Sequence, residues 1–144
     1  TPSMLCVEDY LDTLQWAKSI GGLSATVARS DANAKVLSDW VAATPWIEHL
    51  AKDTAFRSNT SVCLKVADAA VTRLSADDQA AFAKTLAGLL EKEGVAYDIA
   101  YYRDAPPGLR IWCGATVERH DVEALTPWLE WAFAEAKSSL PKAA

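Results

Sequence analysis

The residues best suited to chemistry in this sequence lie between positions 101 and 117. Apolar and polar residues alternate from Leu109 to Val117, the pattern of a strand with one buried face, so Arg110 is expected on the open face. Arg103 stands across a stiff Pro-Pro-Gly loop, and Gly114 would leave space beside Arg110. Two guanidinium groups so placed could clamp a ligand with two anionic groups. The alternative is an ordinary solvated arginine on a sheet surface.

Other catalytic signatures are missing from the sequence. It has no glycine-rich phosphate loop, no nucleophile elbow and no spacing typical of metal ligands. The lysines fall on polar helix faces, and nothing marks one as a desolvated Schiff-base lysine. His49 and His120 are isolated and are expected to be surface or cap residues. Because these catalytic signatures are missing, the sequence predicts the binding half of a site and not a complete active site. The three cysteines are expected to be reduced core thiols of a cytosolic protein: Cys6, Cys63 and Cys113.

The composition is that of a globular domain. The 144 residues suffice for one domain with its own core, and the net charge of -5 argues against nucleic acid or an acidic membrane surface as a partner. No run of residues is long enough to span a bilayer. The chain opens on Thr1-Pro2 without an initiator methionine or a signal segment, which is typical of a fragment.

The elements that must hold the arginines follow from hydrophobic periodicity and from capping residues. The second helix is expected to bury a stripe that includes Leu23, Val27 and Leu37. The predicted elements, in order, are a helix over 3–20 ended by Gly21-Gly22, a helix over 23–43, an edge strand over 46–50, a strand over 60–66, a helix between Ser75 and Gly94, a hairpin of strands over 95–101 and 109–117, and a helix over 121–138 that Pro127 kinks or restarts. This order predicts an α+β fold with a small, mostly antiparallel sheet and helices packed on one face.

Three segments resemble a known family. Thr1–Tyr10, Arg57–Lys65 and above all Tyr102–Trp112 look like the C-terminal part of phosphoserine aminotransferase of the alpha-proteobacterial type, a fold-type I, class V family dependent on pyridoxal phosphate. The resemblance covers nearly the whole chain. It implies a leading helix over 1–22 that joins a large domain absent from this chain, and a C-terminal small domain over 23–144.

The resemblance also implies site residues. Arg110 matches the arginine that binds the substrate carboxylate, and Arg103 falls near the family's His-Arg pair that receives the substrate phosphate. Tyr102 replaces the histidine of that pair, and the loop is one residue longer. Thr1 matches a threonine that reaches the cofactor phosphate across the dimer, and the start of the first helix suits an anion as well.

A whole enzyme of this family transfers an amino group between glutamate and 3-phosphohydroxypyruvate to make O-phosphoserine. It is a cytoplasmic homodimer whose Schiff-base lysine lies in the large domain, so the resemblance implies that this fragment alone is inactive and holds no cofactor. Its partners would be the small-molecule substrates phosphoserine and glutamate and the large domain, with neither nucleic acid nor membrane. Three alternatives stay open: the small domain of another class V aminotransferase, a free-standing α+β amino-acid-binding module, and a protein-interaction module whose arginines are merely solvated.

Overall fold

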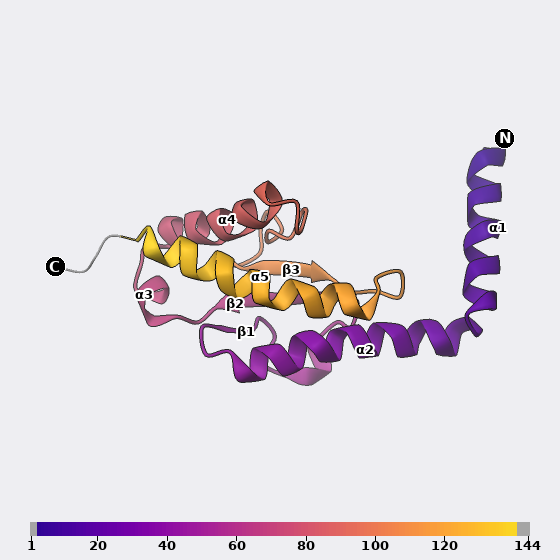
Figure 1. Ribbon diagram of the computed structural model, residues 1–144, viewed down its shortest axis with the longest axis horizontal. Helices are drawn as coiled ribbons and strands as arrows, with labels where there is room; N and C mark the ends of the chain where they lie inside the picture. The colour runs from indigo at the N-terminus through magenta and orange to yellow at the C-terminus, as the bar shows by residue number, and fades with distance from the viewer. Residues whose placement is uncertain (1–2, 141–144) are drawn as a thin grey trace.

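A computed structural model describes residues 3–140 and shows an α+β fold, as the sequence predicts (Figure 1). Three antiparallel strands form one sheet in the order β1-β2-β3. The elements, in chain order, are α1 (Met4–Ser19), α2 (Gly22–Ala43), β1 (Ile47–His49), η1 (Thr54–Phe56), β2 (Ser61–Val66), α3 (Ala69–Thr72), α4 (Ala76–Lys92), β3 (Leu109–Trp112) and α5 (Arg119–Ser138).

One face of the sheet is buried under helices and the other is open. Val62 of β2 lies opposite Ile111 of β3, and Leu64 lies opposite Leu109; all four side chains are buried. They join a core with apolar residues of α2, α4 and α5. The intervening side chains of Cys63 and Trp112 are exposed, so the strand alternation predicts both faces correctly.

A carboxylate on α5 ties the start of the sheet to two helices. Glu130 accepts hydrogen bonds from the Trp40 indole (2.9 Å), the Thr44 hydroxyl (3.1 Å) and the Trp46 indole (2.7 Å). The Trp46 ring also stacks on Phe133 with the ring centroids 4.0 Å apart. Both indole donors are thereby satisfied while the rings pack against the core, the usual requirement for a buried tryptophan.

The helix ends follow the sequence closely. Ser75 caps α4 by accepting from the Asp78 amide, and Gly94 follows α4 with a φ of 71°. Helix α5 runs without a break through Pro127, so of the two alternatives, a kink or a restart, the restart is wrong. The proline lacks an N–H for the Glu123 carbonyl four residues earlier, and the Thr126 hydroxyl donates to that carbonyl instead at 3.0 Å.

The predicted hairpin is mostly wrong. Residues 95–101 form no strand, and their pairing with β3 is limited to one isolated bridge between Ala100 and Leu109. Asp98 has a φ of 53°, in the left-handed region, which interrupts extended backbone at that point. Strand β3 ends at Trp112 instead of Val117, because the next residues turn towards α2.

The expectation of three core thiols holds for one cysteine. Cys113 is buried, and this burial raises the pKa of its thiol to about 11. Cys63 is exposed because it lies on the open face of β2, and Cys6 is exposed because α1 has no buried residue. All three are free thiols.

Helix α1 stands apart from the sheet. Figure 1 shows it projecting from the far end of α2, and the two glycines at the junction have φ values of 112° (Gly21) and 73° (Gly22). The predicted boundary after residue 22 therefore coincides with a sharp turn, while the division into domains stays a prediction. None of the helices within residues 3–140 is long and apolar enough to cross a membrane.

Candidate functional site

Arg110 lies on the open face of the sheet, as the strand pattern predicts. Its partner across the ladder is Cys63 of β2, and 36% of its side chain is exposed. Arg110 Nη2 lies 3.2 Å from Oδ2 of Asp98, whose side chain is 90% exposed. Exposed ion pairs contribute about 0–1 kcal/mol. A ligand carboxylate that binds in two-pronged geometry can therefore displace Asp98 at little cost.

The guanidinium is not fully satisfied by the described residues. Arg110 Nε is shielded from solvent and meets no hydrogen-bond acceptor among residues 3–140. A shielded donor without a partner costs about 1–3 kcal/mol and is uncommon in folded proteins. Because Nε is shielded, an anion would meet the Nη groups of Arg110, of which Nη2 pairs with Asp98.

Two hollows border Arg110. One, of about 260 Å³, lies between Arg110, the 96–99 segment, Trp112 and Leu125. The other is smaller, about 50 Å³, and brings Arg110 together with Cys63 and Tyr102. The larger of the two hollows has room for a small anion beside Arg110.

The structure brings together only part of the predicted clamp. Tyr102 lines the small hollow beside Arg110, but Arg103 does not line either hollow next to Arg110. A turn closed by the Ala105 amide and the Tyr102 carbonyl (2.8 Å) follows Tyr102, and Arg103 is exposed within it. Thr1, the predicted cofactor contact, lies outside the described residues.

Gly114 does not provide ligand space, so this expectation is wrong. A Cβ atom on Gly114 would lie 2.6 Å from Cζ2 of Trp112. The indole packs where any other side chain would begin. The glycine makes room for Trp112, whose ring borders the larger hollow beside Arg110.

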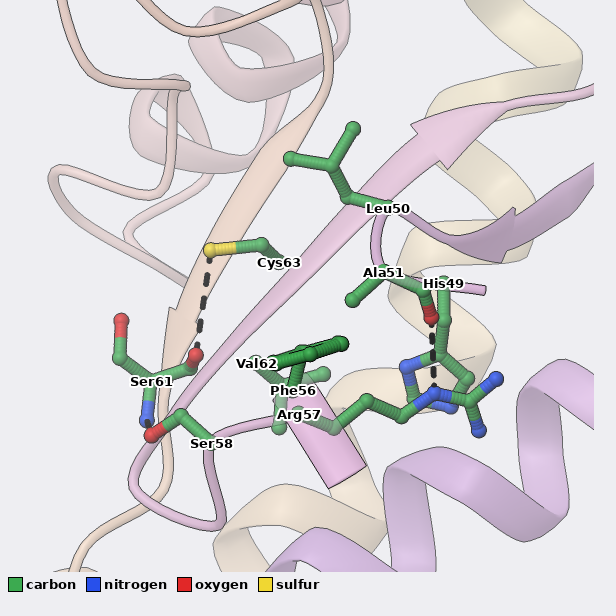
Figure 2. Close-up of a pocket in the computed structure, with 9 residues that line it drawn as sticks. All are labelled: His49, Leu50, Ala51, Phe56, Arg57, Ser58, Ser61, Val62 and Cys63. Carbon is green, nitrogen blue, oxygen red and sulfur yellow. Dashed lines mark hydrogen bonds between the residues drawn. The ribbon is translucent and has the colours of Figure 1, made fainter. Parts of the chain in front are cut away.

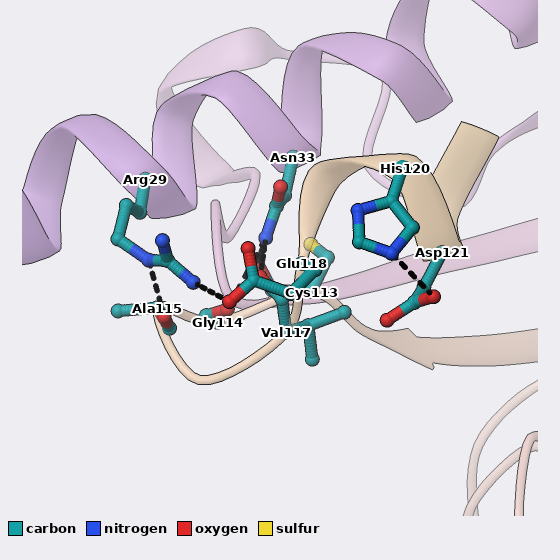
Figure 3. A network of polar contacts seen from close by, with 9 residues as sticks. All are labelled: Arg29, Asn33, Cys113, Gly114, Ala115, Val117, Glu118, His120 and Asp121. Atoms are coloured by element: carbon teal, nitrogen blue, oxygen red, sulfur yellow. Dashed lines mark hydrogen bonds and ion pairs between the residues drawn. The ribbon is translucent and has the colours of Figure 1, made fainter.

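The loop after β3 is held by α2, through a residue that the sequence analysis missed (Figure 3). Asn33 Nδ2 donates to the carbonyls of Val117 (2.8 Å), Cys113 (3.2 Å) and Gly114 (3.3 Å). Arg29 adds a bond from Nε to the Ala115 carbonyl (2.8 Å) and an ion pair with Glu118. These contacts fix the end of the strand that carries Arg110.

The buried face of α2 also differs from the predicted stripe. Leu23 and Val27 are exposed, and the buried residues are Ser30, Asn33 and Leu37. Two polar residues at helical spacing with a core leucine were the available signal for this contact. They lie inside because the loop after β3 supplies carbonyl acceptors.

A third hollow, which the sequence did not indicate, lies at the edge of the sheet (Figure 2). His49 and Arg57 both line it. His49 is half-buried, so the expectation of a surface or cap histidine is wrong for it, whereas His120 is exposed near Asp121. Burial lowers the pKa of His49, and the nearby positive charge of Arg57 lowers it further. No cluster of residues suited to a metal ion occurs within 3–140.

The fold and site define an α+β domain that presents an arginine on an open sheet face. Comparisons with known proteins show which proteins this domain is similar to. No family model matches the chain. Over 133 residues it is 50% identical to phosphoserine aminotransferase from Methanosarcina mazei and 51% identical to that from Methanosarcina barkeri. These matches cover 92% of this chain and 33% of each relative, so the chain spans about a third of their length.

Solved structures share the fold. Phosphoserine aminotransferase from Bacillus circulans subsp. alkalophilus matches 94% of this chain and 34% of its own, with a TM-score of 0.76 and 19% identity. A plant protein, Oryza sativa TDC with PLP and tryptamine, matches 83% of this chain and 25% of its own, with a TM-score of 0.65 and 22% identity.

The chain is thus homologous to the C-terminal portion of phosphoserine aminotransferase. Both curated relatives are archaeal, so they support the resemblance to the family without its alpha-proteobacterial type.

Proposed function

We propose that this chain is the C-terminal part of a phosphoserine aminotransferase and supplies its recognition of substrate anions. The observation that carries the proposal is the identity of 50% and 51% over 133 residues to two such enzymes. The reaction proposed for the whole enzyme converts 3-phosphohydroxypyruvate and glutamate to O-phosphoserine and 2-oxoglutarate. The structural likeness alone would not single out phosphoserine aminotransferase, because a differently named protein, Oryza sativa TDC, shares the fold.

In this proposal Arg110 binds the α-carboxylate of the substrate. A guanidinium offers two parallel N–H groups that match the two oxygens of a carboxylate. The weak pair with Asp98 holds the side chain in place between substrates, and the hollows beside it admit the ligand. The support is the strand position of Arg110 on the open face of the sheet and the weakness of its only ion pair among the described residues.

Tyr102 and Arg103 are the proposed contacts to the substrate phosphate. Tyr102 borders the hollow next to Arg110, and its hydroxyl can donate a hydrogen bond to a phosphate oxygen. Arg103 is exposed on the same loop and would have to turn towards the hollow when substrate binds. Such loop adjustments are common when a site closes over its ligand.

The proposal assigns pyridoxal phosphate to the rest of the polypeptide, where it would serve as the electron sink of transamination. In the described range, Lys65 is half-buried in an ion pair with Glu48, and the other lysines are exposed. No residue there is set up as a desolvated Schiff-base lysine, so residues 3–140 do not by themselves fit the cofactor. The isolated chain is accordingly expected to be inactive.

The wider assembly also belongs to the proposal: a cytoplasmic homodimer, with Thr1 near the cofactor phosphate and α1 leading into a large domain. We also propose that the enzyme is of the alpha-proteobacterial type within the family, as the residues of segment 102–112 suggest. The other readings are a different class V aminotransferase and a free-standing amino-acid-binding module.

The test is a transamination assay on the full polypeptide that carries this chain. Phosphoserine with 2-oxoglutarate should give glutamate far faster than alanine or cysteine does, because only phosphoserine has the second anion. The isolated 144 residues should show no sustained turnover with added pyridoxal phosphate. Preference for alanine or cysteine would instead support another class V enzyme.

A further inference from the structure

The hollow lined by His49 and Arg57 has the features of a small-molecule site separate from Arg110. It measures about 260 Å³ and lies at the edge of β1, where the 51–58 segment folds back beside β2. In Figure 2 the Arg57 guanidinium lies beside His49. This hollow takes no part in the proposed function.

Arg57 is held rigidly and keeps unused donors. Its Nε donates to the Ala51 carbonyl (2.9 Å) and its Nη2 to the Lys52 carbonyl (3.0 Å). Within residues 3–140 no carboxylate forms an ion pair with it. The Nη1 group makes no hydrogen bond to the described protein, so a fixed cation remains available to a ligand.

The rest of the lining is uncharged and partly apolar. None of the nine lining residues is an acid, and the large apolar residues among them are Leu50, Phe56 and Val62. His49 is kept neutral near pH 7, because burial and Arg57 both oppose its protonation. The site therefore offers one positive charge and apolar surface.

We propose that the His49–Arg57 hollow binds a small monocarboxylate with an apolar side chain. The carboxylate would lie against the Arg57 guanidinium, and the apolar group would lie against the exposed Phe56 ring. A polyanion such as phosphate is disfavoured, because a single guanidinium in this lining has to neutralise it. Leu50 and Cys63 also border the small hollow next to Arg110, so the two sites are neighbours with separate cations.

The test is a titration of the ¹⁵N-labelled 144-residue chain with phenylacetate, followed by NMR. The amide signals of Ala51, Ser58 and Val62 should shift and saturate. Binding should weaken at least tenfold in Arg57→Gln, the loss expected for a charge-assisted hydrogen bond. Arg73→Gln is the matched control, because Arg73 is exposed outside the hollow, and it should bind as the parent chain does.

A second variant guards against loss of the loop structure in Arg57→Gln. Phe56 is 80% exposed, so Phe56→Ala should leave the fold intact while weakening phenylacetate several-fold and acetate little. Equal affinity in the Arg57→Gln chain, tighter binding of inorganic phosphate, or shifts confined to residues around Arg110 would overturn the proposal. None of these outcomes depends on transaminase activity.

Discussion

Replacing Asn33 by aspartate changes the side chain that joins α2 to the loop after β3 from a hydrogen-bond donor to an acceptor. Asn33 is 1% exposed, and its amide nitrogen lies within 3.3 Å of three carbonyl oxygens. The amide has two protons for these three acceptors, so about two hydrogen bonds are lost, each worth about 1 kcal/mol. Leaving buried acceptors unpaired beside a carboxylate adds about 1–3 kcal/mol. Asn33→Asp should therefore lower the free energy of unfolding by about 3–5 kcal/mol at pH 7.

The pH dependence sharpens this prediction. Burial against carbonyl oxygens raises the pKa of the new carboxyl above its unfolded value of about 3.9, so the folded state binds more protons than the unfolded state. The destabilisation should therefore be smallest near pH 4 and should grow as pH rises towards 7. Urea unfolding followed by tryptophan fluorescence measures both effects.

Asn59→Asp is the exposed comparison: it replaces a donor to Asp31 by a second carboxylate, but at a position where solvent screens the repulsion. Its effect should stay near 1 kcal/mol or less. The reasoning is refuted if Asn33→Asp costs no more than Asn59→Asp, or if its cost is the same at pH 4 and pH 7.

Further predictions concern buried groups. Glu130→Gln should cost about 1–2 kcal/mol in thermal or urea unfolding, because one carbonyl oxygen replaces two oxygens that accept three hydrogen bonds; exposed Glu135→Gln should cost almost nothing. His49 has a lowered pKa, mainly from burial and secondarily from Arg57. Its contribution to the free energy of unfolding is therefore fully present above about pH 6.5 and is lost as pH falls through the lowered pKa. The stability difference between parent and His49→Gln chains should therefore shrink on acidification, and a difference independent of pH would contradict this. Cys113 is buried with a pKa raised to about 11, so a thiol reagent at pH 8 should label the other two cysteines rapidly and this one only on unfolding; rapid labelling of all three would count against the fold.

The parts of the fold that sequence predicts well are those with local signals. Ser75 and Gly94 mark the ends of α4 because capping needs only nearby backbone groups. The alternation around Val62 and Ile111 identifies the buried face of the sheet because one side packs on helices. Residues 95–101 show the limit: their composition suits a strand, but the left-handed backbone at Asp98 limits pairing to one bridge.

The candidate site also has parts that local sequence signals predict and parts that they do not. Strand periodicity places Arg110 on the open face, and the structure agrees. Asn33 was missed because its partners are backbone carbonyls 80 or more residues away, which no local pattern reveals. The His49–Arg57 hollow was missed for a related reason: Arg57 bonds to the carbonyls of a loop whose shape depends on the tertiary fold.

The central claim is that Arg110 receives the substrate carboxylate in a full-length enzyme, and the most direct test is the steady-state kinetics of Arg110→Lys beside Arg73→Lys. Lysine keeps the charge but loses the two-pronged donor, so transition-state stabilisation should fall by about 1–3 kcal/mol. This loss lowers kcat/KM for phosphoserine roughly 5- to 150-fold. Arg73→Lys should leave it unchanged. If Arg110→Lys retains the parent kcat/KM, Arg110 is an ordinary surface residue and the account is contradicted.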